Sequence, residues 1–320
     1  MAAFSHPLFM KRKLMPKALP VNSKTAASPA LMQNLRDVAE VMPLLVILLG
    51  LFGGAVVLGI LQSFGYAPWF GINEFPTTRY FERLWLSVDF WASLGLTLYY
   101  GFAATLIGLV ISIPLSIALS KKFRASRVFG TLIRLPLMVP YTVGIALALV
   151  MLGNGGLLSR ISAGLGLIDD PAQFVQILKT HGGCGIIAVY VWKQVPFMTL
   201  TLSAVLARKG EDTVEAAMVL GANSRQIFWR VTLPQIMPGI VSACLICFAF
   251  NIGAFEAPLI LGGGYPDTLP VLAWRYFQDA NYAFQLQGMA VVVSLALVSG
   301  IFLAAYLLGY RRYERARGRV

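Results

Sequence analysis

Six long apolar runs dominate this chain of 320 residues, and their length restricts the folds that it can adopt. Their approximate limits are 41–63, 90–119, 132–152, 185–206, 237–261 and 287–309. Each run is near the ~20 residues that an α-helix needs to cross the hydrocarbon core of a bilayer. Only 12% of the residues are charged, too few to cover a water-soluble globule of this size. The sequence therefore predicts an all-α, polytopic membrane protein with six transmembrane helices.

The charges between the runs predict the orientation of the chain. The segments assigned to the cytoplasm hold 20 Lys and Arg against 6 acids, whereas the external loops hold 5 against 7. This asymmetry follows the positive-inside rule, so the net charge of +12 sets topology and does not indicate nucleic-acid binding. We expect a flexible basic tail over 1–40, a membrane domain over 41–310 and a second basic tail over 311–320, with both tails in the cytoplasm.

The polar loop at 207–236, between the fourth and fifth runs, predicts a short helix, a turn and a second helix. Asp212 and Glu215 have the spacing of a capping box at a helix start. Gly221 then permits a backbone turn that a residue with a Cβ resists. Asn223 and Gln226 offer a second capping pair, and the proline at 234 is expected to stop the second helix before the chain re-enters the membrane.

The same loop resembles the "EAA" loop of binding-protein-dependent ABC importer permeases of type I. In that family Glu-Ala-Ala is followed by a Gly six residues after the Glu, and then by a branched aliphatic residue, one further residue and Leu-Pro. The matching positions here are Glu215, Ala216, Ala217, Gly221, Val231, Leu233 and Pro234. Val231 stands where Ile is commoner. If this family spacing is set aside, the alternative interpretation of the loop is an ordinary amphipathic helix at the membrane surface.

The resemblance implies a set of partners and a compartment. The first helix of the loop would dock onto an ABC ATPase dimer, and the chain would pair with a second permease, either a homologue or a copy of itself. An external solute-binding protein would deliver the solute, and the assembly would lie in a bacterial inner membrane. No G-x-x-x-x-G-K-[ST] motif is present, so ATP and Mg²⁺ are expected on the separate ATPase and no cofactor in this chain.

Three polar residues within the predicted spans are candidates for the solute pathway. Lys193 lies in the fourth run, and Asn251 and Glu256 lie in the fifth, where Gly253, Pro258 and Gly262–Gly264 weaken regular helix. Charged groups at membrane depth are costly and suggest function. Lys193 and Glu256 are placed to share a depth, either as a structural pair or as groups that face the solute; Lys193 alternatively snorkels outward.

Two stretches of the membrane domain resemble permeases grouped with spermidine/putrescine, phosphonate and related importers, and most of all those of the spermidine/putrescine type. They are GAFE-x-P…GG in the fifth run and PLMVPYTVGIALAL over 136–149, and the likeness extends over about 90–310. It suggests a small polar or charged solute, polyamine-like as a first hypothesis.

Two other function classes stay open at this point. A secondary transporter predicts several ionisable groups near mid-membrane, where we find essentially one Lys and one Glu. A membrane scaffold or receptor subunit predicts that changes at Asn251, Lys193 or Glu256 leave solute uptake unaffected. We expect no catalytic site and no metal site, because Cys244 and Cys247 have no His or acid nearby in the sequence.

Overall fold

A computed structural model describes residues 40–120, 126–209 and 212–316. The predicted basic tail over 1–40 lies outside these ranges except for Glu40, which is helical. Contacts divide the chain into two compact units, Met1–Val57 and Leu58–Val320. In the described part of the first unit, the helix that starts at Glu40 contains a π-helical stretch, η1 (Leu48–Gly53), with no buried residue.

The remaining elements are mostly helices, with one two-stranded antiparallel sheet. Up to the end of the second long helix they are α2 (Gly54–Ser63), β1 (Tyr66–Ala67), η2 (Pro68–Phe70), β2 (Ile72–Asn73), α3 (Arg79–Trp85) and α4 (Val88–Ser120). The middle of the chain forms α5 (Ser126–Met138), α6 (Tyr141–Leu152), α7 (Leu157–Gly164), η3 (Pro171–Gln173) and α8 (Cys184–Lys209). The last part forms α9 (Asp212–Val219), α10 (Ser224–Ile227), η4 (Phe228–Thr232), α11 (Leu233–Gly253), α12 (Glu256–Leu261), α13 (Leu269–Phe277) and α14 (Tyr282–Ala316).

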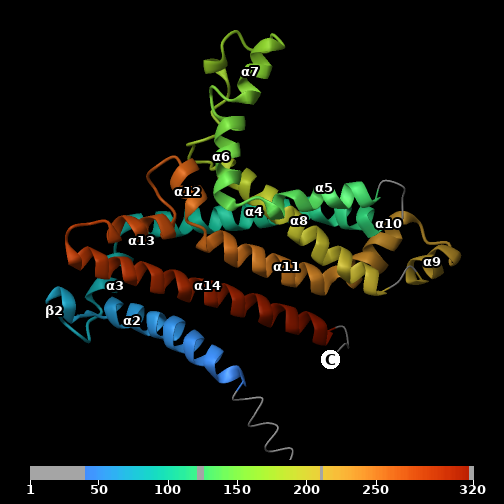
Figure 1. The fold of residues 1–320 in the computed structure, drawn as a ribbon. Coiled ribbons are helices and arrows are strands. Elements are labelled where there is room, and N and C mark those ends of the chain that lie inside the picture. The colour runs from blue at the N-terminus through green and yellow to red at the C-terminus, as the bar shows by residue number, and fades with distance from the viewer. Residues whose placement is uncertain (1–39, 121–125, 210–211, 317–320) are drawn as a thin grey trace, which may run out of the picture. The chain divides into compact units, whose positions relative to one another are not determined.

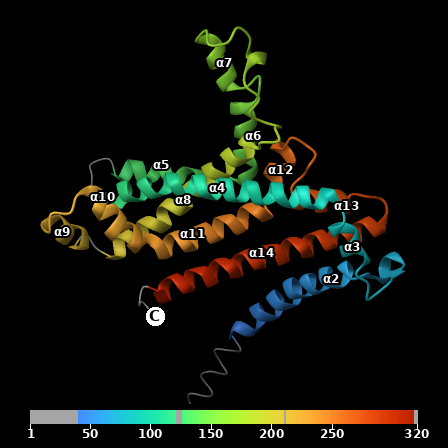
Figure 2. The same cartoon turned by 180° about the vertical axis from the view of Figure 1, so that it is seen from behind.

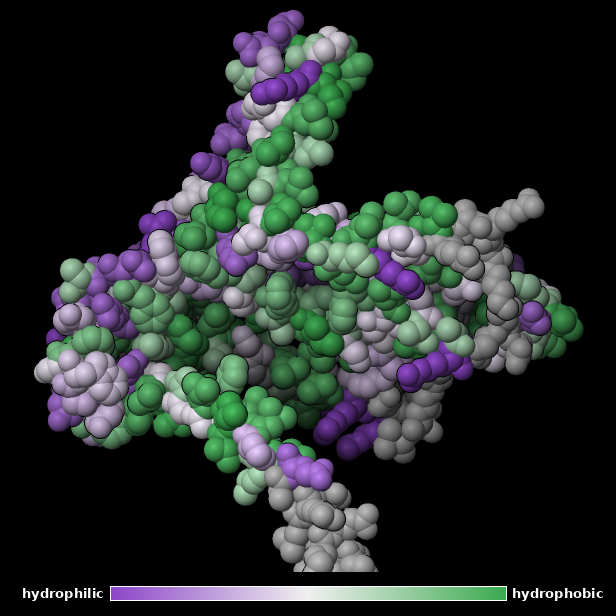
Figure 3. Space-filling model, viewed as in Figure 1, coloured by the Kyte–Doolittle hydropathy of each residue, from purple (hydrophilic) through white to green (hydrophobic). Residues whose placement is uncertain are grey.

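Six helices in the described part of the chain are long and apolar enough to cross a membrane, as the sequence predicted. They are Glu40–Ser63, Val88–Ser120, Tyr141–Gly164, Cys184–Arg208, Ser224–Gly253 and Tyr282–Arg312. Apolar side chains cover much of the face shown in Figure 3, including the length of α6. An apolar exterior of this kind is stable in lipid and not in water.

The prediction of one continuous third span over 132–152 is wrong. The helix is interrupted between α5 and α6 at Val139 and Pro140, and Pro140 has the extended ψ of 147° at the start of α6. Proline lacks the N–H of a helical bond and disfavours helical geometry in the residue before it. α6 and α7 then project away from α4, α8 and α11 (Figure 1, Figure 2).

The bounds of the fifth span also differ from the prediction. The fifth span, expected over 237–261, is helical from Ser224 to Gly253, and α12 is a separate short helix after the break at 254–255. The break falls where glycines and proline were expected to weaken the helix. In the predicted basic tail over 311–320, residues 311–316 continue α14 as helix, and 317–320 lie outside the described ranges.

Three helices, α4, α8 and α11, pack side by side and form the centre of the second unit (Figure 1). Glycine permits their close approach: a Cβ on Gly108 of α4 would lie 2.7 Å from Nε2 of Gln194 on α8. Small residues at helix interfaces are typical of membrane proteins, because they bring backbones and polar side chains together. This packing places the polar groups of α8 and α11 next to α4.

Candidate functional site

The predicted coupling loop folds as a helix, a turn and a second helix. α9 carries Glu215 and Ala216 on its exposed surface, with Ala217 half-buried. Gly221 has a φ of +80°, and the N–H groups of Gly221 and Ala222 donate to the carbonyls of Met218 and Ala217 at 2.9 and 3.0 Å. This pairing is a Schellman motif, which needs a left-handed residue after the helix. The turn predicted at Gly221 is confirmed.

The second predicted capping pair is also confirmed. The side chain of Asn223 accepts from the backbone N–H of Gln226, and the side chain of Gln226 accepts from that of Asn223, both at 2.9 Å. At the other end of the loop, Gln235 donates to the hydroxyl of Thr213 at 2.8 Å and so ties the start of α9 to α11. Side-chain hydrogen bonds therefore hold the turn between α9 and α10 and join the start of α9 to α11.

Pro234 does not stop the second helix, contrary to the prediction. α10 continues through the π-helical η4 into α11, so that Val231, Leu233 and Pro234 lie in one helical segment. π-Helical turns occur at places where the regular bonding pattern is interrupted, and proline interrupts it because it has no N–H to donate. The loop therefore connects to the membrane segment through a continuous helix.

Apolar side chains at the end of α9 are the part of this loop that the sequence analysis did not identify as functional. Val219 and Leu220 are each 87% exposed and Met218 is 58% exposed. The sequence did carry a signal for them, because apolar residues follow Glu-Ala-Ala in an otherwise polar loop. A contiguous exposed apolar patch often marks a binding surface. Trp229 of η4, also exposed, adds to the apolar surface of the loop.

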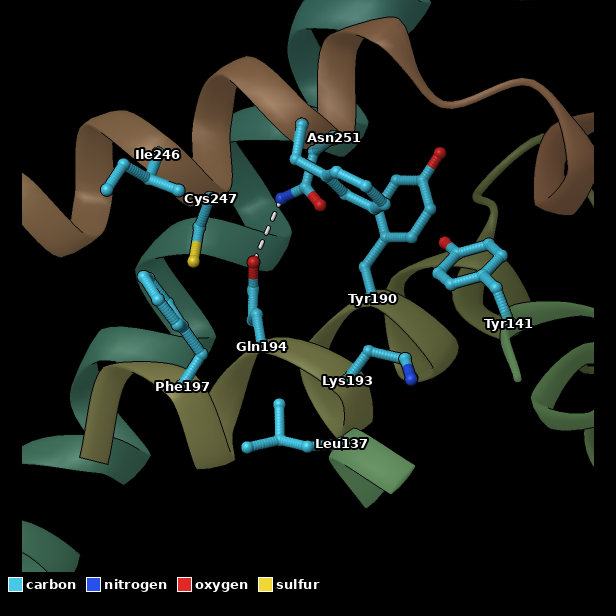
Figure 4. Close-up of a pocket in the computed structure, with 10 residues that line it drawn as sticks. Leu137, Tyr141, Tyr190, Lys193, Gln194, Phe197, Ile246, Cys247 and Asn251 are labelled. Carbon is cyan, nitrogen blue, oxygen red and sulfur yellow. Dashed lines mark hydrogen bonds between the residues drawn. The ribbon is translucent and has the colours of Figure 1, made fainter. Parts of the chain in front are cut away.

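A second candidate site is a cavity of about 240 Å³, which we call the central cavity. Its lining comes from α5, α6, α8 and α11: Leu137, Tyr141, Tyr190, Lys193, Gln194, Phe197, Ile246, Cys247, Phe250 and Asn251 (Figure 4). Most of these side chains are apolar or aromatic. A few polar groups in a mainly apolar cavity are typical of small-molecule sites.

Gln194 connects the three central helices through a buried hydrogen-bond network. Its Nε2 donates to the carbonyl of Ala104 on α4, and its Oε1 accepts from Nδ2 of Asn251 on α11 at 3.0 Å (Figure 4). Asn251 also lies 3.3 Å from the hydroxyl of Thr105. Asn251 is thus brought to the cavity, as the sequence analysis proposed, but the structure shows that its amide is also a structural contact. Gln194 had not been identified, because one amide in an apolar helix carries no spacing signal.

Lys193 lies at the cavity without the acidic partner that the sequence suggested. Its ammonium donates to the carbonyls of Pro136 and Val139, both at 2.8 Å, and no ion pair with Glu256 occurs among the described residues. The break before Pro140 leaves these carbonyls without helical partners, which is why the ammonium binds there. Glu256 begins α12 with an exposed side chain and is absent from the cavity lining.

Tyr141 supplies a polar group that the sequence analysis also missed. Its hydroxyl is buried and has no hydrogen-bond partner in the described part of the chain. In Figure 4 its ring faces Tyr190, on the same side of the cavity as Lys193. A buried hydroxyl without a partner is uncommon, and beside a cavity it is a group that a ligand can satisfy.

The sequence of this chain is similar to those of known transport proteins. The family described as "Binding-protein-dependent transport system inner membrane component" matches residues 104–315. A spermidine/putrescine permease protein, PotB of Haemophilus influenzae, is 30% identical over 233 residues, which are 72% of this chain and 76% of that protein. A molybdenum permease protein, ModB of Mycobacterium tuberculosis, is 29% identical over 206 residues, which are 62% and 74% of the two chains.

Solved structures show the same fold at lower identity. A chain of a bacterial alginate ABC transporter, solved in complex with an alginate pentasaccharide-bound periplasmic protein, matches with a TM-score of 0.75 and 18% identity. The match covers 90% of the present chain and 98% of that chain. The six-helix architecture is therefore one already seen in solved membrane transporters.

Proposed function

This chain belongs to the family of binding-protein-dependent transport system inner membrane components, the permeases of ABC importers, and from this membership we propose how it works. It forms half of a solute pathway together with a second permease, a homologue or a copy of itself. It couples to a dimer of ATPases, which hold ATP and Mg²⁺, and receives solute from an external binding protein. The observation that carries the proposal is the exposed apolar end of α9 in the turn defined by Gly221.

The coupling step would use the loop as a rigid connector. The end of α9 would insert into a groove of the ATPase through Val219 and the adjoining Leu220, both exposed, with Glu215 available to a basic residue of that partner. Because α10, η4 and α11 form one helical segment, movement of the docked loop would reach Asn251 and the central cavity directly. Closure of the ATPases would then swing the spans from an inward-open to an outward-open arrangement.

Replacing Val219 with aspartate should abolish co-purification with the ATPase while leaving the membrane domain folded. Val219 is 87% exposed, so the charge enters water in the isolated chain but would be desolvated in the docked complex. The matched control is Val175→Asp, at a 74% exposed valine between α7 and α8. Retention of the ATPase by both variants would refute docking through α9, and loss in both would show that the substitution acts on folding.

The orientation proposed for the chain places both termini in the cytoplasm. A fluorescent protein that folds only in the cytoplasm, fused after Val320, should be bright, and alkaline phosphatase at that position should be inactive. Phosphatase inserted at Asp170, in the acidic segment between α7 and α8, should be active. The reverse pattern at the two sites would invert the topology and move the coupling loop away from the ATPases.

The solute would be small and polar or charged, and it would pass through the central cavity. The polyamine-like hypothesis draws support from the relatives that are named as spermidine/putrescine permease proteins. Other relatives carry different names: one is a molybdenum permease protein, and the MalF protein of Thermococcus litoralis, 24% identical over 235 residues, is named for trehalose and maltose. These names do not agree on a solute, so its class has to be inferred from the residues of this chain.

A further inference from the structure

The charge of the central cavity bears on which solute the proposed pathway carries. Lys193 is the one charged side chain among the residues that line it, and no carboxylate occurs in that lining as far as the chain is described. α12 packs against α6 and α8, and its single acid, Glu256, is exposed and outside the lining, although its carboxylate acts electrostatically on Tyr141. The lining therefore carries the positive charge of Lys193 with no acidic side chain among its own described residues.

The hydrogen bonds of Lys193 leave this charge available. Its two acceptors, the carbonyls of Pro136 and Val139, are neutral, so they position the ammonium without cancelling its charge. An ammonium has three N–H donors, and two carbonyl bonds leave one for a ligand. The surrounding Leu137, Phe197 and Phe250 are apolar and keep the local dielectric low, which strengthens attraction for an anion and repulsion of a cation.

A second donor lies on the same side of the cavity. The Tyr141 hydroxyl is buried without a partner, and an O–H can donate to an anionic oxygen. We propose that the central cavity accepts a small anion, an oxyanion or a carboxylate, held by the ammonium of Lys193 and the hydroxyl of Tyr141. This inference rests on the proposed function, and it replaces the polyamine-like hypothesis, because a polyamine would meet a like charge.

The test measures the electrostatic potential of the cavity and needs no knowledge of the solute. Ile246 lines the cavity and is 56% exposed, so Ile246→Cys introduces a reporter thiol there. The native thiols at Cys184, Cys244 and Cys247 are first replaced by alanine. The complete transporter in nanodiscs is then treated with anionic and cationic methanethiosulfonates of equal size. The ratio of the two rates is normalised to that of Asn73→Cys, an exposed position on the short strand β2.

We expect the normalised ratio to favour the anionic reagent by about tenfold or more, since focusing in clefts raises local ion concentrations by that order. Lys193→Arg should keep this preference. Lys193→Gln should abolish it, although the Gln amide retains donors for the two carbonyls. Co-purification of the ATPase checks that each variant assembles.

The other outcomes separate the inference from the function on which it rests. A preference for the cationic reagent, or an anionic preference that survives in Lys193→Gln, would overturn the anion proposal and leave the pathway intact. No reaction with any reagent, including a neutral one, would show that the cavity is closed to water and would overturn the pathway as well. If the anionic preference disappears only when phosphatidylglycerol is added to the nanodiscs, a lipid headgroup neutralises Lys193. The anion that occupies the site would then be a lipid instead of a solute.

Discussion

Replacing Gly221 with valine should uncouple the permease from its ATPases and lower ATP-dependent solute uptake. Gly221 has a φ of +80°, and an added Cβ would meet no atom within 4 Å, so the penalty comes from the backbone conformation alone. A left-handed conformation costs an ordinary L-residue roughly 1–2 kcal/mol, and valine is among the residues least suited to it. The chain would relieve this strain by unwinding the Schellman motif, which would displace α9. We expect uptake to fall by roughly tenfold, the factor that ~1.4 kcal/mol represents.

The matched control is Gly221→Asn, because asparagine tolerates the left-handed conformation. Uptake and ATPase co-purification should stay near wild-type levels in this variant. If valine and asparagine reduce uptake equally, the backbone conformation is not the cause and the side chain itself must obstruct docking. Full uptake with valine would show that the turn at Gly221 is not required for coupling.

Gln194→Leu should destabilise the membrane domain. Gln194 donates to the carbonyl of Ala104 and accepts from Asn251, so its loss leaves the Asn251 amide with the hydroxyl of Thr105 alone. A buried polar group left without its partner costs about 1–3 kcal/mol. The free energy of unfolding, measured by SDS titration in micelles, should decrease by an amount in this range.

A double-mutant cycle with Asn251→Leu tests whether the hydrogen bond is the cause. The double variant should lose less than the sum of the two single losses, with a coupling of about 0.6–1.7 kcal/mol as seen for hydrogen bonds between membrane helices. Thr105→Val, which removes only the longer contact at 3.3 Å, should have a smaller effect. Strict additivity of the two leucine substitutions would show that Gln194 and Asn251 contribute independently.

Local patterns allowed much of the coupling loop to be predicted. The Asn223–Gln226 capping box and the turn at Gly221 depend on residues at most a few positions apart, so spacing alone identifies them. Pro234 was misread because proline is an equally common signal at a helix start and at a stop; the helical residues before it decided its role. The exposed apolar residues Val219 and Leu220 became conspicuous only when their exposure was known.

The sequence by itself determined the membrane class, the number of spans and the likeness to importer permeases, because hydrophobic length and loop charge act locally along the chain. Only the tertiary structure decided the partners of the polar groups inside the membrane. Lys193 binds carbonyls 54 and 57 residues away instead of Glu256, and Gln194 joins helices that lie far apart in the chain. These hydrogen-bond partners depend on which faces of the helices meet and on where a proline leaves a carbonyl without its helical bond. The spacing of residues along one helix predicts neither of these.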